Sequence, residues 1–369
     1  MINKSEYQLR LRQICLFFIA FTPILRFFML PSLISELAGE DMWLSSLINV
    51  MADFIAVMVL LICCKRENAD FYTLLKRKFG DATAKTVFVL YALFFTLKAV
   101  LPICEQRDYI ELTLYNTFPS ILNFLPLFGI CFYFALKHLR VVGRASDIMW
   151  LTSITGFIIL FSLSVPNTDF GAILPVGARG FSAIKKAAIS SFNWYGDGAY
   201  MLFFIGNFRW EKKGGIKIAL SYLLSAAITV LFMITFYGIF KSLSFRQRFA
   251  LTEMSKYSTV INNIGRFDYI GIFFILLSSF FSLSMPVFFA CHAINRAFNL
   301  KRKWIFPLII SGLLAAFTGF FGEYFFGLEK IITEKLPVVF FIFGNAVPLL
   351  TPLLTVKSKK TEKVNYETV

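Results

Sequence analysis

Residues 21–33 read FTPILRFFMLPSL, where Pro23 and Pro31 bracket the charged residue Arg26 inside an apolar run that covers residues 13–37. Proline has no backbone N–H and its ring clashes with the preceding turn, so carbonyl groups near positions 19 and 27 lose their helical partners. At membrane depth, such carbonyls are tolerated only where they are buried in protein or line a wet cavity. The stretch therefore predicts a membrane helix that is interrupted near its middle.

The composition of the whole chain places this run in a membrane protein. Of 369 residues, 57% are hydrophobic and only 16% are charged, and 46 are Phe. About a quarter of the residues of a soluble protein are charged, so this chain lacks the polar surface of a soluble domain. We expect an all-α integral membrane protein whose main surroundings are the lipid bilayer.

Ten apolar runs are long enough to cross a bilayer, since each crossing needs about 20 residues. The expected spans cover residues 13–37, 41–64, 86–110, 120–138, 147–166, 187–208, 216–243, 267–295, 303–326 and 336–356, and 357–369 form a polar tail. Most of the 37 Lys and Arg residues lie in alternate connecting segments, which predicts that both termini are cytoplasmic. We attribute the net charge of +15 to loops that face anionic lipid and not to a nucleic-acid partner. Two connecting segments, 69–80 and 250–266, have the pattern of amphipathic surface helices.

A second interruption is expected in the sixth run, where residues 190–208 read SSFNWYGDGAYMLFFIGNF. Gly196 and Gly198 flank Asp197, and Asn193 precedes them. Two interrupted helices, one opening each group of five, point to an inverted-repeat transporter with a ligand site near the bilayer midplane. A structural kink in the first run and close helix packing at the glycines are the alternatives.

Charged residues inside the runs mark the candidate site. Arg26 and Lys98 lie well within the first and third runs, where an unpaired charge costs several kcal/mol and is functional by default. Asp197 is the natural partner of Arg26 if the two interrupted helices meet. Lys98 either has a structural role or extends to an interface. We expect Glu105, Arg107, Asp108 and Glu111 to form a solvated rim, and Ser278, Ser279, Ser282 and Ser284 to bond their own backbone.

The sequence offers no sign of enzymatic chemistry. It has no phosphate-binding glycine loop, no HExxH and no Ser/His/Asp arrangement, and its six cysteines lie in or beside apolar runs without a CxxC pair. We expect no enzyme activity, no cofactor and no metal site.

Residues 30–45, LPSLISELAGEDMWLS, resemble the junction of the first two spans in the B subunits of endospore germinant receptors, or spore-germination permeases. Pro31, Ala38, Gly39, Asp41 and Trp43 carry the resemblance. Weaker similarity follows in order at FYTLLKRKFG (71–80), ILPVGARG (173–180) and GRFDYIGIF (265–273).

The resemblance implies the fold of the amino acid–polyamine–organocation transporters, a LeuT-like arrangement of two inverted five-helix repeats with broken first and sixth helices. It also implies a pocket between these helices, with ligand-binding candidates Thr22, Pro23, Ile24, Arg26, Phe192, Asn193, Gly196 and Asp197. Arg26 departs from the family, which usually has small or apolar residues at this break.

Three functions stay open. The favoured one is a membrane subunit of a spore germinant receptor, in the bacterial cell membrane or spore inner membrane. It recognises a small nutrient such as an amino acid, acts alongside A and C subunits, and helps to trigger germination. The alternatives are a secondary amino acid transporter coupled to protons or cations, and a non-binding structural subunit whose pocket is closed by Arg26 and Asp197.

Overall fold

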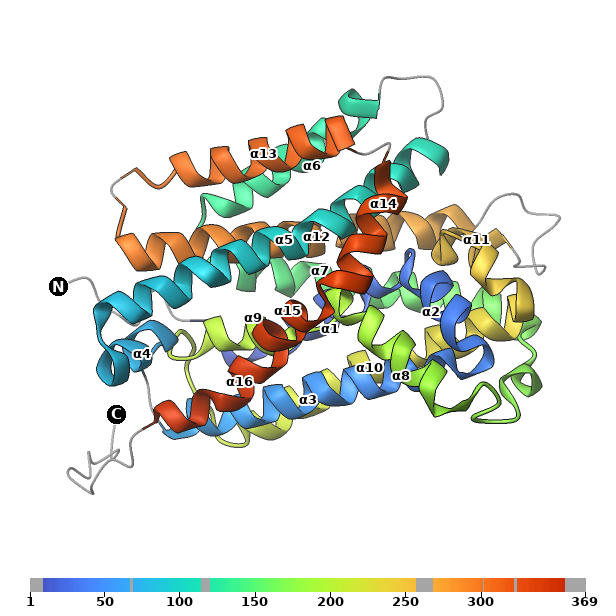
Figure 1. The fold of residues 1–369 in the computed structure, drawn as a ribbon, viewed down its shortest axis with the longest axis horizontal. Coiled ribbons are helices and arrows are strands. Elements are labelled where there is room, and N and C mark those ends of the chain that lie inside the picture. Colours follow the sequence, from blue (N-terminus) through green and yellow to red (C-terminus); the bar gives the residue numbers. More distant parts are fainter. Residues whose placement is uncertain are drawn as a thin grey trace.

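The computed structural model describes residues 9–66, 69–113, 120–256, 268–300, 302–321 and 324–355, which form α-helices joined by short turns (Figure 1). Within this part of the chain, six helices are long and apolar enough to cross a membrane: Leu30–Arg66, Asp81–Glu111, Leu139–Asn167, Gly214–Arg246, Ile270–Phe298 and Pro337–Leu354. Phe124–Ala135 and Ile305–Phe320 are shorter apolar helices. The all-α membrane class is therefore confirmed.

The first apolar run is interrupted at the prolines. α1 (Leu11–Phe21) ends before Pro23, a 3₁₀ turn covers Ile24–Arg26, and α2 (Leu30–Ala38) starts with Pro31 in its first turn. Proline is tolerated there because the first amides of a helix have no helical acceptor. The chain thus changes from one helix to another at the predicted place.

The sixth apolar run is interrupted at Gly196. α8 (Gly180–Ser190) is followed by the 3₁₀ turn Phe192–Trp194, and α9 begins at Asp197 and ends at Phe204. Gly196 has φ +92°, in the left-handed region that favours glycine. Asp197 occupies the first turn of α9, where a carboxylate interacts favourably with the helix dipole.

The remaining long helices surround these two interrupted ones. They are α3 (Met42–Arg66), α5 (Asp81–Thr113), α6 (Ser120–Ala135), α7 (Leu139–Ser164), α10 (Gly214–Phe240), α12 (Asp268–Phe298) and α13 (Ile305–Phe321). α12 packs against α5, α6 and α7, while α1 contacts α7 and α10, and α3 runs along α10 (Figure 1). α6 and α13 pack together along one edge of the bundle.

Aromatic rings fill the centre of the bundle, which accounts for the many phenylalanines. Tyr200 on α9 lies 4.5 Å from Phe21 and 5.3 Å from Phe289, measured between ring centroids. Phe289 on α12 in turn lies 5.6 Å from Phe95 on α5. Such pairs add to the hydrophobic burial and hold α1, α5, α9 and α12 in one core.

The last helical stretch, residues 325–354, contains two π-helical turns that no residue type in the sequence predicts, and the first of them precedes the expected run 336–356. α14 (Phe325–Lys330) leads into the π turn Ile331–Lys335 and α15 (Pro337–Phe341). The π turn Ile342–Ala346, α16 (Val347–Leu350) and the 3₁₀ turn Thr351–Leu354 follow. Single π turns inside helices occur frequently at functional sites.

The connecting segment 69–80 forms the expected amphipathic helix, α4 (Phe71–Phe79). It buries Phe71, Tyr72, Leu74 and Leu75 and exposes its basic end. Asp70, directly before α4, accepts a hydrogen bond of 2.7 Å from Nε of Arg296 at the end of α12. Burial alone would raise the pKa of Asp70, but this guanidinium holds it below its ordinary value.

The expected surface helix at 250–266 is corrected. α11 covers Ala250–Lys256, and most of its residues are buried because its start inserts beside the first helix break. Residues 257–266 lie outside the described part of the chain, as does the polar tail 357–369.

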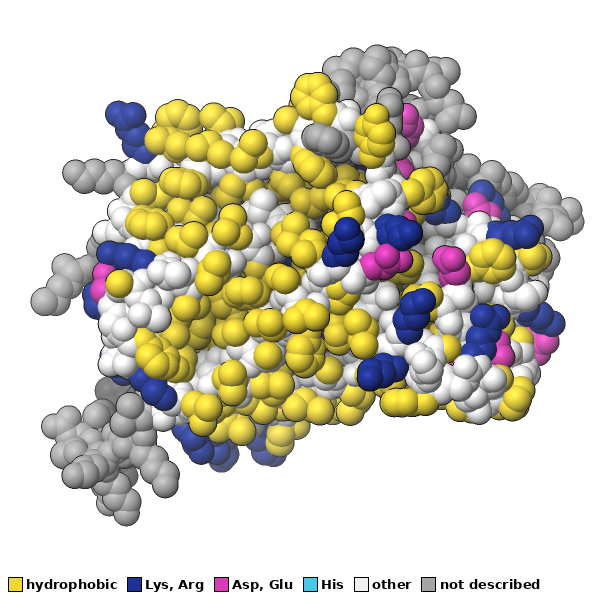
Figure 2. Space-filling model, viewed as in Figure 1, with side chains coloured by type: hydrophobic (Ala, Val, Ile, Leu, Met, Phe, Trp, Pro, Cys, Tyr) yellow, Lys and Arg dark blue, Asp and Glu magenta, His cyan; other side chains and the backbone are white. Residues whose placement is uncertain are grey.

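The surface in Figure 2 carries a broad hydrophobic area between two charged ends. The end at which α4 lies is mainly basic, whereas the opposite end, near α2, α8 and α11, carries both acidic and basic side chains. A wide apolar band of this kind fits contact with lipid.

Candidate functional site

The first interrupted helix is held by backbone hydrogen bonds both before α1 and at its break. Before α1, the backbone of Leu9 exchanges hydrogen bonds with the chain after α9, since the amide of Leu9 donates to Asn207 (2.9 Å) and its carbonyl accepts from Arg209 (3.0 Å). At the break itself, the amides of Ala250 and Leu251 donate to the carbonyls of Phe28 (3.0 Å) and Phe27 (3.1 Å). The start of α11 therefore satisfies carbonyls that the prolines free.

Arg26 connects the first break to the sixth. Its side chain is fully buried, and Nη2 donates to Asp197 at 2.8 Å and to Asp53 at 3.3 Å. Nε donates to the carbonyl of Trp194 at 3.2 Å, and the guanidinium carbon lies 4.1 Å from the ring centre of Tyr195. The expected meeting of Arg26 and Asp197 is present in the structure.

Asp53 on α3 is a member of the site that the sequence analysis missed. Its carboxylate accepts the backbone N–H of Gly196, with both oxygens 2.9 Å from the nitrogen, and its side chain is fully buried. The signal was available, because Asp53 is an acidic residue in the middle of the apolar run 41–64, as unusual there as Arg26 is in the first run.

Tyr222 on α10 completes the surroundings of Asp197. Its hydroxyl donates to Oδ2 of Asp197 at 2.8 Å, the same oxygen that accepts from Arg26. No pattern in the sequence indicated this contact, since a tyrosine in an apolar run is usually a packing residue. Side chains from α3, α9 and α10 thus surround the ion pairs of Arg26.

Lys98 on α5 is buried and binds the backbone of the sixth break. Its ammonium group donates to the carbonyl of Asn193 at 2.7 Å and to the carbonyl of Tyr195. These carbonyls belong to the irregular turn between α8 and α9, where no helical amide can reach them. Of the two roles considered for Lys98, the structure shows the structural one.

The four buried charges cancel. Arg26 and Lys98 are cations, Asp53 and Asp197 are anions, and none of the four is more than 4% exposed. Burying a charge is costly unless it is paired and hydrogen-bonded. Arg26, Asp53 and Asp197 meet this condition through ion pairs with one another, and Lys98 is stabilised by hydrogen bonds to two backbone carbonyls.

Some polar atoms at the breaks have no hydrogen-bond partner among the described residues. They are Oγ1 of Thr22, Nη1 of Arg26, and both Oδ1 and Nδ2 of Asn193, all buried. Buried polar atoms almost always have partners, so such a group of orphaned donors and acceptors points to a further hydrogen-bonding species. Donors and acceptors together suit a zwitterionic or polar small molecule.

The other candidates at the breaks have backbone or packing roles in the structure. The carbonyl of Pro23 accepts from the amide of Arg26 at 3.0 Å, and Ile24 is completely buried. Gly196 lies so close to Gly344 that a Cβ on Gly196 would be 3.0 Å from the Cα of Gly344. Phe192 packs its ring 5.2 Å from Phe341.

Glu105 is not part of a solvated rim. It is 2% exposed and accepts a hydrogen bond of 2.9 Å from Nε1 of Trp194, so it lies against the sixth break. Asp108 pairs with Arg248 at 2.9 Å and is also largely shielded. The sequence could not show this, because the helical position of a charge does not reveal what packs over it.

Three of the four serines of α12 bond their own helix as expected, whereas the hydroxyl of Ser278 instead contacts α7, at 2.6 Å from Oγ1 of Thr152 and 3.4 Å from the carbonyl of Met149. Ser279, Ser282 and Ser284 each donate to a backbone carbonyl three or four residues earlier. Among the described residues, His, Cys, Asp and Glu form no group of three or more that could hold a metal ion.

Two interrupted helices that meet at a buried charge network, within a bundle of apolar helices, are the architecture of a permease-like membrane protein. A family model described as spore germination protein matches residues 10–323, and the chain belongs to this family of permease-like membrane proteins.

The chain is similar to known proteins both in sequence and in structure. The spore germination protein GerQB of Bacillus cereus is 23% identical over 291 residues, which are 75% of this chain and 76% of GerQB. The crystal structure of MhsT in complex with L-phenylalanine matches with a TM-score of 0.64 and 14% identity, covering 93% of this chain and 86% of MhsT. At this identity the match shows the fold, which is of the LeuT type.

Proposed function

We propose that this protein is a membrane subunit of a spore germinant receptor that binds an amino acid or a similar small nutrient between the two helix breaks. The proposal includes ten membrane helices in two inverted groups of five, both termini in the cytoplasm, and A and C subunits as partners. Family membership and the LeuT-type fold support it. The observation that carries it is that Thr22, Arg26 and Asn193, which lie at the two breaks, each have a buried polar atom without a partner among the described residues.

The chemistry of these atoms suits an amino acid. Nη1 of Arg26 is a charged donor for a carboxylate, which guanidinium groups bind strongly. Thr22 and Asn193 supply acceptors for an ammonium group as well as further donors. A ligand bound here touches both interrupted helices, and it changes their equilibrium only if it binds one arrangement more tightly than another. Such a shift is the signal that the receptor would pass to its partners.

A non-binding structural subunit is the second candidate, and the neutral charge network favours it. Arg26 is already held by two carboxylates and a carbonyl of its own chain, so these groups close the site without a ligand. In that case the network serves to hold the two breaks together. Transport of an amino acid, the remaining alternative, would appear as uptake of labelled substrate by the protein alone in liposomes.

Thermal stabilisation of the detergent-purified protein by a panel of amino acids, sugars and nucleosides tests the proposal. A ligand that binds only the folded state raises the unfolding midpoint as its concentration increases. We expect one or a few amino acids to do so. Thr22→Val should weaken this effect by about 3- to 10-fold in affinity, the value of one hydrogen bond. Its hydroxyl has no partner in the described chain, so the variant should fold normally.

Thr235→Val is the matched control. Thr235 on α10 is also buried, its hydroxyl has no partner in the described chain, and it lies 13 residues beyond Tyr222, about 20 Å along the helix. This variant should leave ligand stabilisation unchanged. A folded protein that responds to no member of the panel would favour the structural subunit, and equal effects of both variants would place the ligand elsewhere.

A further inference from the structure

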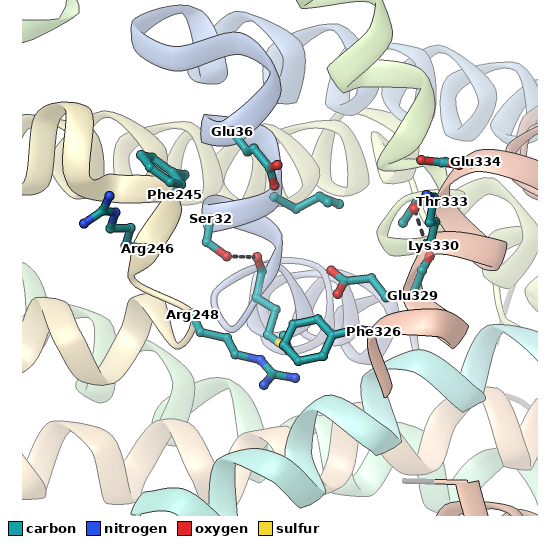
Figure 3. A pocket seen from close by; sticks show the side chains of 12 residues that line it. Ser32, Glu36, Phe245, Arg246, Arg248, Phe326, Glu329, Lys330, Thr333 and Glu334 are labelled. Atoms are coloured by element: carbon teal, nitrogen blue, oxygen red, sulfur yellow. Dashed lines mark hydrogen bonds between the residues drawn. The ribbon is translucent and has the colours of Figure 1, made fainter. Parts of the chain in front are cut away.

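A cavity lies at each end of the molecule, and the charges that line the two cavities differ. The larger one, of about 420 Å³, lies between α2 and α14, and both acidic and basic side chains line it (Figure 3). They are Glu36, Glu329, Glu334, Arg246, Arg248 and Lys330. Such a mixed lining selects neither an anion nor a cation.

The smaller cavity, of about 190 Å³, lies at the opposite, mainly basic end, where α6 and α12 end and α7 begins (Figure 1). Arg296 on its wall donates to Asp70 directly before α4, which places the cavity at the α4 end. Pockets for drug-sized molecules measure about 300–1,000 Å³, so this space suits a small polar group.

The charged side chains that line the smaller cavity are all basic. No Asp or Glu is found among the described residues of the lining, whereas it contains Lys137, His138, His292, Arg296 and Lys303. Arg296 is already paired with Asp70. In the described part of the chain, the ammonium groups of Lys137 and Lys303 form no ion pair. The cavity therefore favours an anion.

The start of α7 adds to this preference. α7 has 26 residues and begins at Leu139, which lines the cavity, and the side chain of His138 at the N-cap position does not cap it. The N-terminus of a helix carries partial positive charge, and its first backbone amides are directed outward and bind phosphate groups. The helix dipole and the two lysines thus act in the same direction.

One acceptor in the lining is buried and has no partner among the described residues, namely Oδ1 of Asn295 on α12. A buried acceptor almost always receives a hydrogen bond, so its partner must be a donor. An ionised phosphate diester has no donor of its own, but a glycerol group attached to it has hydroxyl groups. The lining therefore fits a group that combines a negative charge with a hydroxyl.

The surroundings of the cavity are those of a membrane surface. Tyr133 on α6 is 54% exposed, and its ring centre lies 4.4 Å from Nζ of Lys137. Trp304, next to Lys303, is 51% exposed. Tyr and Trp are enriched at the level of lipid headgroups, which is where a cavity at the end of α6 and α12 is expected to open.

We propose that this cavity binds a glycerophosphate group, supplied either by the headgroup of an anionic lipid such as phosphatidylglycerol or by a soluble glycerol phosphate. The phosphate accepts hydrogen bonds from Lys137, Lys303 and the first amides of α7. A glycerol hydroxyl donates to Oδ1 of Asn295. None of these residues belongs to the helix breaks, so the site does not rest on the function proposed above.

Thermal unfolding of the purified full chain in detergent tests the site with three additives. Phosphatidylglycerol has the negative charge and the hydroxyl groups, phosphatidylcholine has a phosphate without net charge or hydroxyl groups, and glycerol 3-phosphate is the soluble headgroup. We expect phosphatidylglycerol to raise the unfolding midpoint and phosphatidylcholine to leave it unchanged. Stabilisation by glycerol 3-phosphate as well would identify the headgroup as sufficient, and its absence would identify the lipid as the source. No effect of phosphatidylglycerol, or an equal effect of phosphatidylcholine, would overturn the proposal.

Variants separate this cavity from the general attraction of a basic surface for anionic lipid. Lys137→Gln and Lys303→Gln should each raise the phosphatidylglycerol concentration for half of the effect about fivefold, the value of one cation beside an anionic lipid surface. Asn295→Leu should raise it about 3- to 10-fold, the value of one hydrogen bond. Lys212→Gln is the matched control, since Lys212 is an exposed lysine between α9 and α10 and does not line the cavity. Equal effects of all three lysine variants, or no effect of Lys137→Gln and Lys303→Gln, would contradict the proposal.

Discussion

Arg26 and Asp197 belong to a buried group of four charges whose sum is zero, and this balance predicts how substitutions combine. Arg26→Met leaves two carboxylates with Lys98 alone, and Asp197→Asn leaves two cations with Asp53 alone. Breaking a buried pair on one side costs about 3–5 kcal/mol. We expect each single variant to lower the unfolding midpoint strongly and the double variant to recover most of the loss, as measured by thermal unfolding in detergent.

An exposed ion pair serves as the comparison for this result. Arg12 and Asp147 are 3.0 Å apart, but the Arg12 side chain is 67% exposed. Exposed pairs contribute about 0–1 kcal/mol, so Arg12→Met should change the midpoint little. Additive losses in the Arg26→Met, Asp197→Asn double variant would show that the network is not a coupled unit.

A charged residue inside an apolar run is a reliable sign, in the sequence, of a residue that belongs to the buried site. Which charged residues pair with one another can be predicted from the sequence only in part. Arg26 and Asp197 could be matched because each stood at a helix break. Asp53 carried the same signal in the second run but stood in an unbroken helix, so nothing in its neighbourhood linked it to Gly196. Thr22 and Asn193 are ligand-binding candidates because of the resemblance to the family. That their polar atoms are buried without partners among the described residues is shown only by the structure.

Between helices, the sixth break is packed against the last apolar run through two glycines. A Cβ on Gly344, in the π turn Ile342–Ala346, would lie 2.7 Å from the Cα of Gly196. This contact is with backbone and cannot be relieved by rotating a side chain. Overpacking of this kind costs about 1–3 kcal/mol, so Gly344→Ala should lower the unfolding midpoint.

Gly312 provides the control for the Gly344→Ala variant. In the described chain, apart from its own residue, its neighbours and the adjacent turns of its own helix, no atom lies within 4 Å of the place that an alanine methyl group would take at Gly312 on α13. Gly312→Ala should therefore leave the midpoint unchanged or raise it slightly, because alanine favours helix. The same measurement on both variants isolates the contact with Gly196. Equal unfolding midpoints for Gly344→Ala and Gly312→Ala would show that the close contact between Gly344 and Gly196 does not contribute to stability.

An interruption of a helix can be predicted from the sequence where a proline or glycine forces it. It cannot be predicted where packing between distant parts of the chain creates it. Pro23, Pro31 and Gly196 mark the two breaks, since proline lacks a donor and glycine accepts φ +92°. The π turns of the last helical stretch and the burial of α11 have no such residue. α11 is short and enters the protein because its first amides meet the free carbonyls of Phe27 and Phe28, a contact between distant parts of the chain.

Over the complete protein, the charge of the two ends predicts the orientation in the membrane. The end that contains α4 is mainly basic and the opposite end carries both signs (Figure 2). Lys and Arg are enriched in cytoplasmic loops. The basic segment between α9 and α10 should therefore face the cytoplasm, and the segment between α7 and α8 should face outward.

Single cysteines at exposed positions test this orientation. The six native cysteines are all buried, so they should react little with a membrane-impermeant maleimide. Val176, between α7 and α8, and Lys212, between α9 and α10, are both exposed. In intact cells the reagent should label Val176→Cys and spare Lys212→Cys, which should react only after the membrane is permeabilised. The reverse pattern would invert the topology and contradict the orientation that the basic segments predict.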